Sequence, residues 1–204
     1  MKKFWWLLFG LLILYTLGIL VLSVINFDGW VIPLYREIRG PSYFFALNTT
    51  LTMFFLWGSA LLFIVNAMVE SMLQNRTRKI VFYVSQAIIF FYMGFDDRFI
   101  LHEKIGAVLS IDDAFVIIIF GIIEMLILVF YEKIQKQPLS RWKYLLMAGI
   151  GFAIMAIADI KFIPLEAYGI NRTLLEDIPK TWAAFFLMLY PVDILLNRIR
   201  KLVV

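Results

Sequence analysis

The chain has no cysteine and only one histidine among its 204 residues. Without thiols it has no disulfides, thiolate catalysis or cysteine-ligated metal centres, and a single imidazole argues against haem or a histidine-rich zinc centre. Charged residues are also scarce, at 17%, whereas 63% of the residues are hydrophobic. This balance is too apolar for a water-soluble domain and is typical of an integral membrane protein, which excludes a soluble enzyme or a nucleic-acid-binding protein.

Several motifs that mark known chemistries are also missing. The sequence contains no His-Glu-x-x-His pair, no Gly-x-Ser-x-Gly turn, no phosphate-binding loop and no dinucleotide fingerprint. It therefore carries no signal for haem, nucleotide or flavin binding.

Long apolar runs are the main feature that is present. The first run begins after Met1-Lys2-Lys3 and exceeds the roughly 7–15 residues of a signal-peptide core, so we expect a retained span. The predicted spans are residues 4–25, 44–68, 80–97, 114–131, 144–163 and 181–196. Because they account for most of the chain, the sequence predicts an all-α fold, a single transmembrane domain over residues 1–204 built as a six-helix bundle.

The distribution of cations sets the expected orientation. If the N-terminus is cytoplasmic, twelve of the 19 Lys and Arg residues lie on the cytoplasmic side and seven on the other. The positive-inside rule then predicts an N-in/C-in topology. The simplest expected location is the bacterial cytoplasmic membrane, with the chain as a multi-pass protein.

Ionisable residues near the outer ends of the spans are the first candidates for function. With a rise of about 1.5 Å per residue, Asp96, Asp159 and Lys180 fall in one layer just inside the outer interface. A charge within a membrane costs roughly 2.5–3.5 kcal/mol on insertion scales, so each such residue calls for a functional explanation.

The segment from Asp96 to Lys104 extends this layer. If span three continues as a helix to Lys104, then Tyr92, Asp96 and Glu103 share one face. Arg98 and His102 form an i,i+4 pair on a neighbouring face. The alternative is that this segment merely caps a span at the water interface.

Span four carries the deepest charge. Ser110 or an aspartate after it is expected to cap this helix, and Asp113 begins a stripe that runs inward to Glu124. Glu124 lies near the middle of the membrane, where a carboxyl group must be protonated, paired or hydrated. It is either a relay or a neutral hydrogen-bonding core residue.

Two helix-packing features accompany these spans. Gly149, Ala153 and Ala156 form a small-residue face on span five, which favours close approach of another helix or of a second copy. A capping box over residues 173–176 is expected to precede span six.

Together these residues suggest a site at the outer face. The predicted catalytic residues are Asp96, Asp97, His102, Glu103 and Asp159. Oxygen ligands with one imidazole suit a divalent cation, and the predicted ligands are Asp96, His102, Glu103 and Asp113. The predicted substrate-binding cations, suited to an anionic headgroup, are Arg36, Arg39, Arg98 and Lys180.

Three function classes remain open from the sequence. The first is a membrane-embedded enzyme that uses a metal or general acid/base chemistry, such as a hydrolase for a lipid-like substrate. The second is a cation or proton pathway with Glu124 as its deep relay. The third is a non-catalytic membrane-complex subunit or sensor. The expected partners are the bilayer and either a second copy or a partner subunit, with no nucleic acid.

Overall fold

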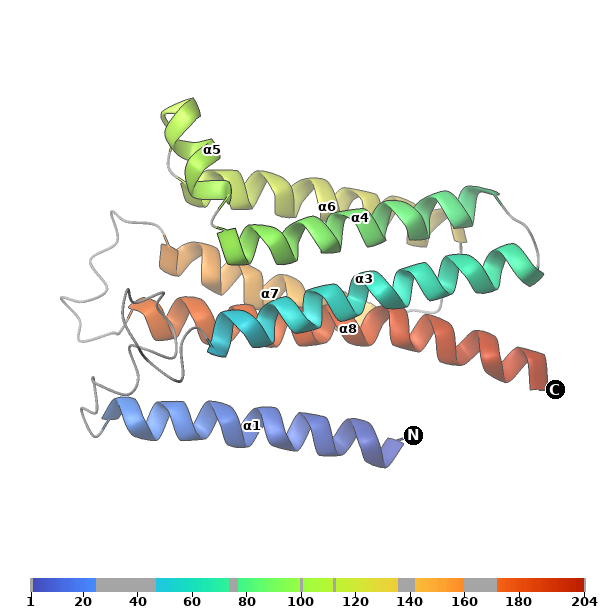
Figure 1. The fold of residues 1–204 in the computed structure, drawn as a ribbon, viewed down its shortest axis with the longest axis horizontal. Helices are drawn as coiled ribbons and strands as arrows, with labels where there is room; N and C mark the ends of the chain where they lie inside the picture. Colours follow the sequence, from blue (N-terminus) through green and yellow to red (C-terminus); the bar gives the residue numbers. More distant parts are fainter. Residues whose placement is uncertain are drawn as a thin grey trace. The chain divides into compact units, whose positions relative to one another are not determined.

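A computed structural model shows helices and no strands in the described part of the chain, which confirms the prediction that the fold is all-α (Figure 1). The described part of the chain forms seven helices: α1 (Lys2–Val24), α3 (Leu47–Leu73), α4 (Thr77–Phe99), α5 (Leu101–Leu109), α6 (Asp113–Gln135), α7 (Trp142–Asp159) and α8 (Arg172–Val203). The structure describes residues 2–24, 47–73, 77–99, 101–111, 113–135, 142–159 and 172–203, and side chains within 6–21, 47–73, 77–99, 101–111, 115–130, 142–158 and 174–200. They fall into two compact units, Met1–Asn48 and Thr49–Val204.

Six of these helices are apolar, in line with the predicted spans. Three are long enough to cross a membrane, namely Leu47–Leu73, Thr77–Phe99 and Leu174–Arg200. Three shorter apolar stretches are Trp6–Val21, Phe115–Phe130 and Trp142–Ala158. The seventh helix, α5, is a short element between α4 and α6 that the six-span prediction did not include.

The first unit consists of α1 and the segment that ends at Asn48. Tyr15 donates a hydrogen bond to the Asn48 side-chain oxygen at 3.3 Å, and the Thr16 hydroxyl bonds back to the Leu12 carbonyl. Apart from Tyr15 and Thr16, positions 4–22 of α1 are apolar on all sides, as expected for a helix with no aqueous face.

Aromatic rings fill the middle of the second unit. Phe63 of α3 is fully buried and stacks on Phe90 of α4, with ring centroids 5.5 Å apart. The ring centroid of Tyr190 on α8 lies 6.2 Å from that of Phe63, and the centroids of Phe55 and Phe185 lie 5.4 Å apart. We call these five residues the aromatic layer. Rings packed at these distances bury large areas and exclude water, so this layer is the dry core of α3, α4 and α8.

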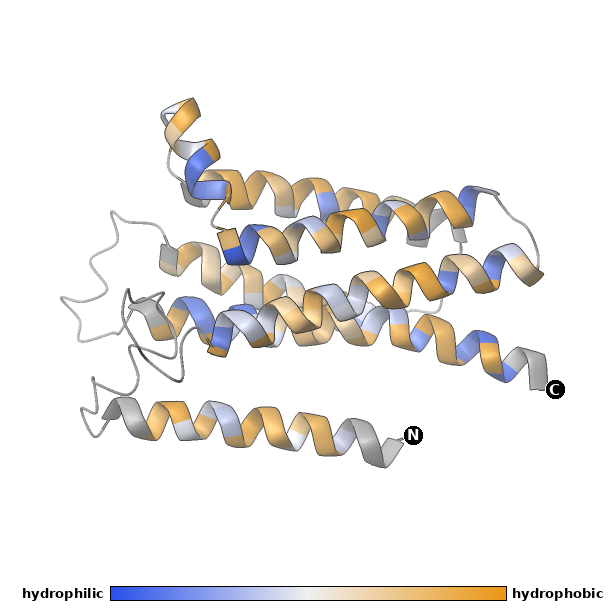
Figure 2. Ribbon diagram, viewed as in Figure 1, coloured by the Kyte–Doolittle hydropathy of each residue, from blue (hydrophilic) through white to orange (hydrophobic). Residues whose placement is uncertain are grey.

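Hydrophilic residues of α4 and α8 gather toward the helix ends, on either side of the aromatic layer (Figure 2). One end of the second unit holds the end of α4, all of α5 and the start of α8, and we call it the α5 end (Figure 1). The start of α4 and the end of α8 lie at the opposite end.

Helices α7 and α8 approach one another closely at Gly151. A Cβ atom on Gly151 would lie 2.8 Å from the Pro179 carbonyl oxygen and 2.9 Å from the Ala183 Cβ. The predicted small-residue face differs in detail, because Ala153 is exposed and Gly149 lies nearest Met125 of α6. Gly151 therefore sets the α7–α8 distance.

Substitution of Gly151 by alanine is expected to destabilise the protein by about 1–3 kcal/mol, because the added methyl group must push apart two rigid backbones. The measurement is the unfolding midpoint in detergent. Gly121→Ala is the matched control, since a Cβ there meets nothing within 4 Å. Equal midpoints for the two variants would contradict the proposed contact.

The helix boundaries correct two predictions about the segment between α4 and α6. Helix α4 ends at Phe99 and α5 begins at Leu101, so a single helix does not continue to Lys104. Of the two predicted caps for α6, Ser110 is wrong, because it follows α5 with φ 56° while the Ile111 amide donates to the Gly106 carbonyl at 3.0 Å. This is the hydrogen-bond pattern of a helix C-terminus in which one residue is left-handed, a position that usually holds glycine. The alternative cap, Asp112, lies outside the described residues.

Helix α8 begins well before the predicted sixth span. It starts at Arg172, so the capping box predicted at 173–176 lies within the helix, and Pro179 and Pro191 are both internal. The Asn66 amide donates to the Pro191 carbonyl at 3.0 Å, which binds α3 to α8 beside the internal proline. The helix places Asp177 and Lys180 one turn apart.

Candidate functional site

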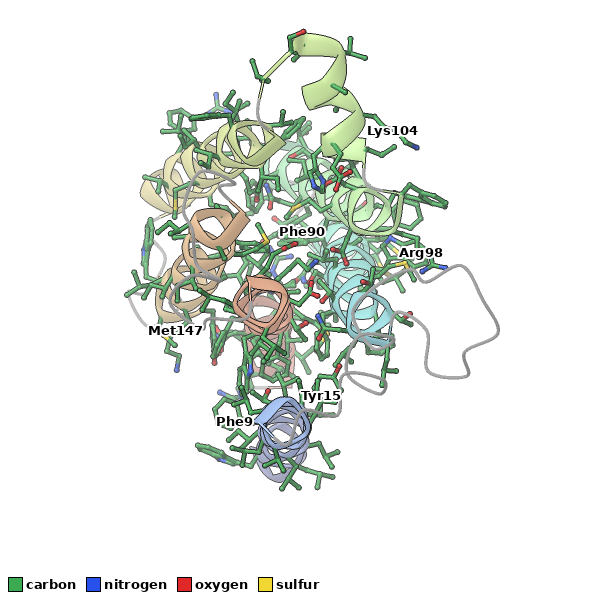
Figure 3. All side chains as sticks on the ribbon, turned by 90° about the vertical axis from the view of Figure 1, so that its left-hand side faces the viewer. Phe9, Tyr15, Phe90, Arg98, Lys104 and Met147 are labelled. Carbon is green, nitrogen blue, oxygen red and sulfur yellow. The ribbon has the colours of Figure 1, made fainter. Side chains whose placement is uncertain are left out.

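Three helix termini bring ionisable side chains together at the α5 end. We define the α5-end cluster by its described members, which are Asp96, Asp97, His102, Asp177 and Lys180. The sequence predicted four of these five residues as site residues. Figure 3 views the second unit from its α5 end, with α5 at the top of the picture.

Asp96 and His102 form a two-point contact across the break between α4 and α5. One carboxylate oxygen accepts a hydrogen bond from the His102 backbone amide at 2.7 Å, and the other lies 2.9 Å from the imidazole Nδ1. Asp96 thus stabilises the start of α5, where amides lack helical partners, and also orients the histidine ring. Both side chains are partly exposed, at 21% for Asp96 and 18% for His102.

A buried ion triad joins α4 to α8. Lys180 Nζ lies 3.0 Å from an oxygen of Asp97 and 2.9 Å from an oxygen of Asp177. The second Asp97 oxygen, Oδ2, is buried and has no hydrogen-bond partner among the described residues. Two carboxylates share one ammonium group, so the ionised triad carries one excess negative charge.

The remaining predicted residues have different surroundings. Glu103 is exposed in the first turn of α5, and Arg98 lies in the last turn of α4, each at the helix end whose dipole suits its charge. Arg98 and Lys104 reach outward on the flank away from α7 (Figure 3). Because α4 ends at Phe99 and α5 begins at Leu101, Arg98 and His102 lie on different helices and do not form the predicted i,i+4 pair on one helix.

Four predicted site residues are not described. The side chains of Asp113 and Asp159 lie outside the described residues. Asp113 is the first residue of α6 and Asp159 the last of α7, and both of these helix termini lie at the α5 end. Arg36 and Arg39 lie outside them entirely. Among the side chains that are described, no three His, Asp or Glu residues lie close enough to hold a metal ion.

Glu124 meets a specific partner inside the second unit. Gln86, which is fully buried on α4, donates an amide hydrogen bond to Glu124 Oε2 at 3.3 Å. Gln86 Oε1 and Glu124 Oε1 are also buried, and neither has a partner within the described part of the chain. The pair thus consists of one hydrogen bond and two unsatisfied oxygens.

A second ionic cluster at the opposite end was not predicted as a site. Glu70, 2% exposed, forms an ion pair with Arg198, and Lys79 lies 3.9 Å from the same carboxyl group. Arg198 also donates to the Tyr83 hydroxyl at 2.8 Å and to the Asn66 carbonyl at 3.3 Å. We call these five residues the opposite-end cluster. The only sequence signal for it was a shared depth near the inner ends of three spans.

The apolar helices with polar clusters at their ends define the class of this chain as a multi-pass membrane protein. The chain belongs to the family described as a domain of unknown function, DUF8692, whose model matches residues 5–194. No curated protein and no solved structure matches the chain.

Proposed function

We propose that the chain crosses the membrane six times with both termini in the cytoplasm, and that the α5-end cluster is a general acid/base site for a lipid-like substrate. The topology is supported by the excess of Lys and Arg in the segments assigned to the cytoplasm. It places the α5-end cluster on the outer side and the opposite-end cluster on the inner side.

The observation that carries this proposal is the Asp96–His102 contact. A carboxylate held at 2.9 Å from Nδ1 fixes the tautomer and the orientation of an imidazole, which is what a histidine needs in order to accept and return a proton. His102 would exchange that proton with the substrate, and Asp96 would stabilise the cationic ring. A lipid-like substrate follows from the position of the pair at the end of an apolar bundle.

The surrounding cations suit an anionic headgroup. Arg98, Arg36 and Arg39 would bind it, because guanidinium groups pair well with phosphate and carboxylate oxygens. Lys180 is less suited to that role than the sequence suggested, since Asp97 and Asp177 already neutralise it.

The test uses the full-length protein in vesicles of phosphatidylethanolamine and phosphatidylglycerol, with lipid products followed by mass spectrometry. We expect conversion by the wild type and a loss of about 10²–10⁴-fold in rate for His102→Gln, the range typical of general acid/base groups. Lys104→Gln, an exposed position on the same helix, is the control and should retain the rate. No conversion by the wild type would favour the non-catalytic subunit or sensor instead.

A divalent cation at this site is a further part of the proposal. Asp96 and His102 would supply two ligands, and Glu103, Asp113 or Asp159 would complete the set. Elemental analysis of the same samples tests this. Near-stoichiometric metal that falls in Asp96→Asn and His102→Gln would support the ion, whereas a metal content unchanged by both variants would remove it.

The Gln86–Glu124 pair favours a second candidate function, a proton or cation pathway. A proton on Glu124 would allow this group to donate to Gln86 Oε1 while it accepts from the amide, which would satisfy an unpartnered oxygen. The aromatic layer, however, separates the two ionic clusters in α3, α4 and α8.

Proton flux into vesicles under an imposed potential tests this second function. If Glu124 is a relay, we expect Glu124→Gln to reduce the flux to that of protein-free vesicles, because an amide cannot exchange a proton in this way. The control is the conservative variant Glu124→Asp, which keeps a carboxyl group at this position and should keep part of the flux. Equal flux in the wild type and Glu124→Gln would contradict a relay.

A further inference from the structure

Helix α5 has a polar start and an apolar end. His102, Glu103 and Lys104 occupy its first turn, and the last turn carries Val108 and Leu109, which are 83% and 60% exposed. Ile111 just beyond the helix is 41% exposed. Exposed apolar side chains concentrated at one end of a helix indicate a surface that is covered by something apolar.

The direction of α5 shows where that surface lies. Helices α4 and α6 run side by side, whereas α5 crosses their direction and extends past the edge of the second unit at its α5 end (Figures 1 and 3). If α4 and α6 cross a membrane, a helix at their ends that runs across them lies along the membrane surface. Its apolar end then projects over lipid and not over the protein.

The apolar end of α5 also belongs to a helix that packs against an exposed apolar side of α6. Helix α5 packs against α6, on which Phe115, Ile119 and Ile122 are 51–54% exposed. The first turn of α5 is fixed by the Asp96–His102 contact, which holds the polar start at the bundle.

We propose that α5 is an interfacial helix whose last turn, Val108 and Leu109, inserts into the lipid leaflet beside α6. The occupant of this surface is the boundary between lipid headgroups and acyl chains, where a helix with separate polar and apolar surfaces is stable. The inference requires α4 and α6 to span the membrane but does not depend on acid/base chemistry. It would place His102 at the depth of the headgroups.

The absence of cysteine makes a direct test possible, because any introduced thiol is the only one in the chain. Val108→Cys and Glu103→Cys are made in the full-length protein, spin-labelled and reconstituted in vesicles of phosphatidylcholine and phosphatidylglycerol. Both positions are exposed, so neither label disturbs a core. Ile122→Cys on α6 serves as the lipid-facing reference.

The readout is the relaxation of each label by oxygen, which concentrates in lipid, and by a water-soluble nickel chelate. We expect the label at 108 to resemble that at 122, with oxygen dominant, and the label at 103 to respond mainly to the chelate. If 108 is as accessible to the chelate as 103 is, the proposal is overturned. Because no turnover is measured, this result is independent of the lipid-conversion assay.

Discussion

Replacement of Lys180 by methionine is expected to lower the free energy of unfolding by about 3–5 kcal/mol, the cost of leaving a buried charge without its partner. Lys180 holds two carboxylates, Asp97 and Asp177, whose side chains are only 9% and 7% exposed. Without the ammonium group these two carboxylates face one another in a poorly hydrated place. The measurement is equilibrium unfolding in mixed detergent micelles.

A repair variant separates charge from packing in this experiment. Lys180→Met combined with Asp97→Asn and Asp177→Asn removes all three charges, so it should recover a large part of the lost stability. Lys104→Met is the control for removing an exposed lysine. If the repair variant is no more stable than Lys180→Met alone, the ion triad is not the source of the loss.

Arg198→Met is expected to cost a similar amount, about 3–5 kcal/mol, at the opposite end. Among the described residues, the substitution leaves Glu70 with Lys79, 3.9 Å away, as its ion-pair partner. It removes donors from the Tyr83 hydroxyl and the Asn66 carbonyl. It also removes a cation that lies over the Tyr83 ring, with the guanidinium carbon 4.9 Å from the centroid. This one side chain therefore links α8 to both α3 and α4.

The same unfolding measurement applies, with Arg200→Met as the matched control because Arg200 is exposed on the same helix. Adding Glu70→Gln to Arg198→Met should restore part of the stability, since the unpaired carboxylate is then gone. An Arg198→Met variant as stable as Arg200→Met would show that the ion pair contributes nothing.

The apolar helices could be predicted because each corresponds to a long hydrophobic run, which can be recognised from neighbouring residues alone. The residues at which the helices begin and end were harder to predict. Asp96 caps α5 from six residues away, a contact made possible only by the break near residue 100, and no periodicity in the sequence marks that break. From the sequence alone, the segment up to Lys104 therefore appears as a continuation of α4.

The sequence placed Lys180 at the same depth as Asp96, although the two lie far apart along the chain, but it did not show which carboxylates Lys180 contacts. Asp177 and Lys180 are three residues apart in the sequence. This spacing brings their side chains together because α8 starts early enough to include both residues. Glu70 and Arg198 lie far apart along the chain, and their contact depends on how α3 packs on α8. Hydropathy indicates the depth of a residue in a span but not the neighbour it faces.

The aromatic layer has a consequence for how substitutions combine. On α4, Asp97 of the ion triad and Tyr83 of the opposite-end cluster are separated by about 21 Å of helix, with the buried Phe90 ring between them. Groups this far apart that share no partner are thermodynamically independent. The Lys180→Met and Arg198→Met effects should therefore add in the double variant, so that either end of the bundle can be redesigned without regard to the other.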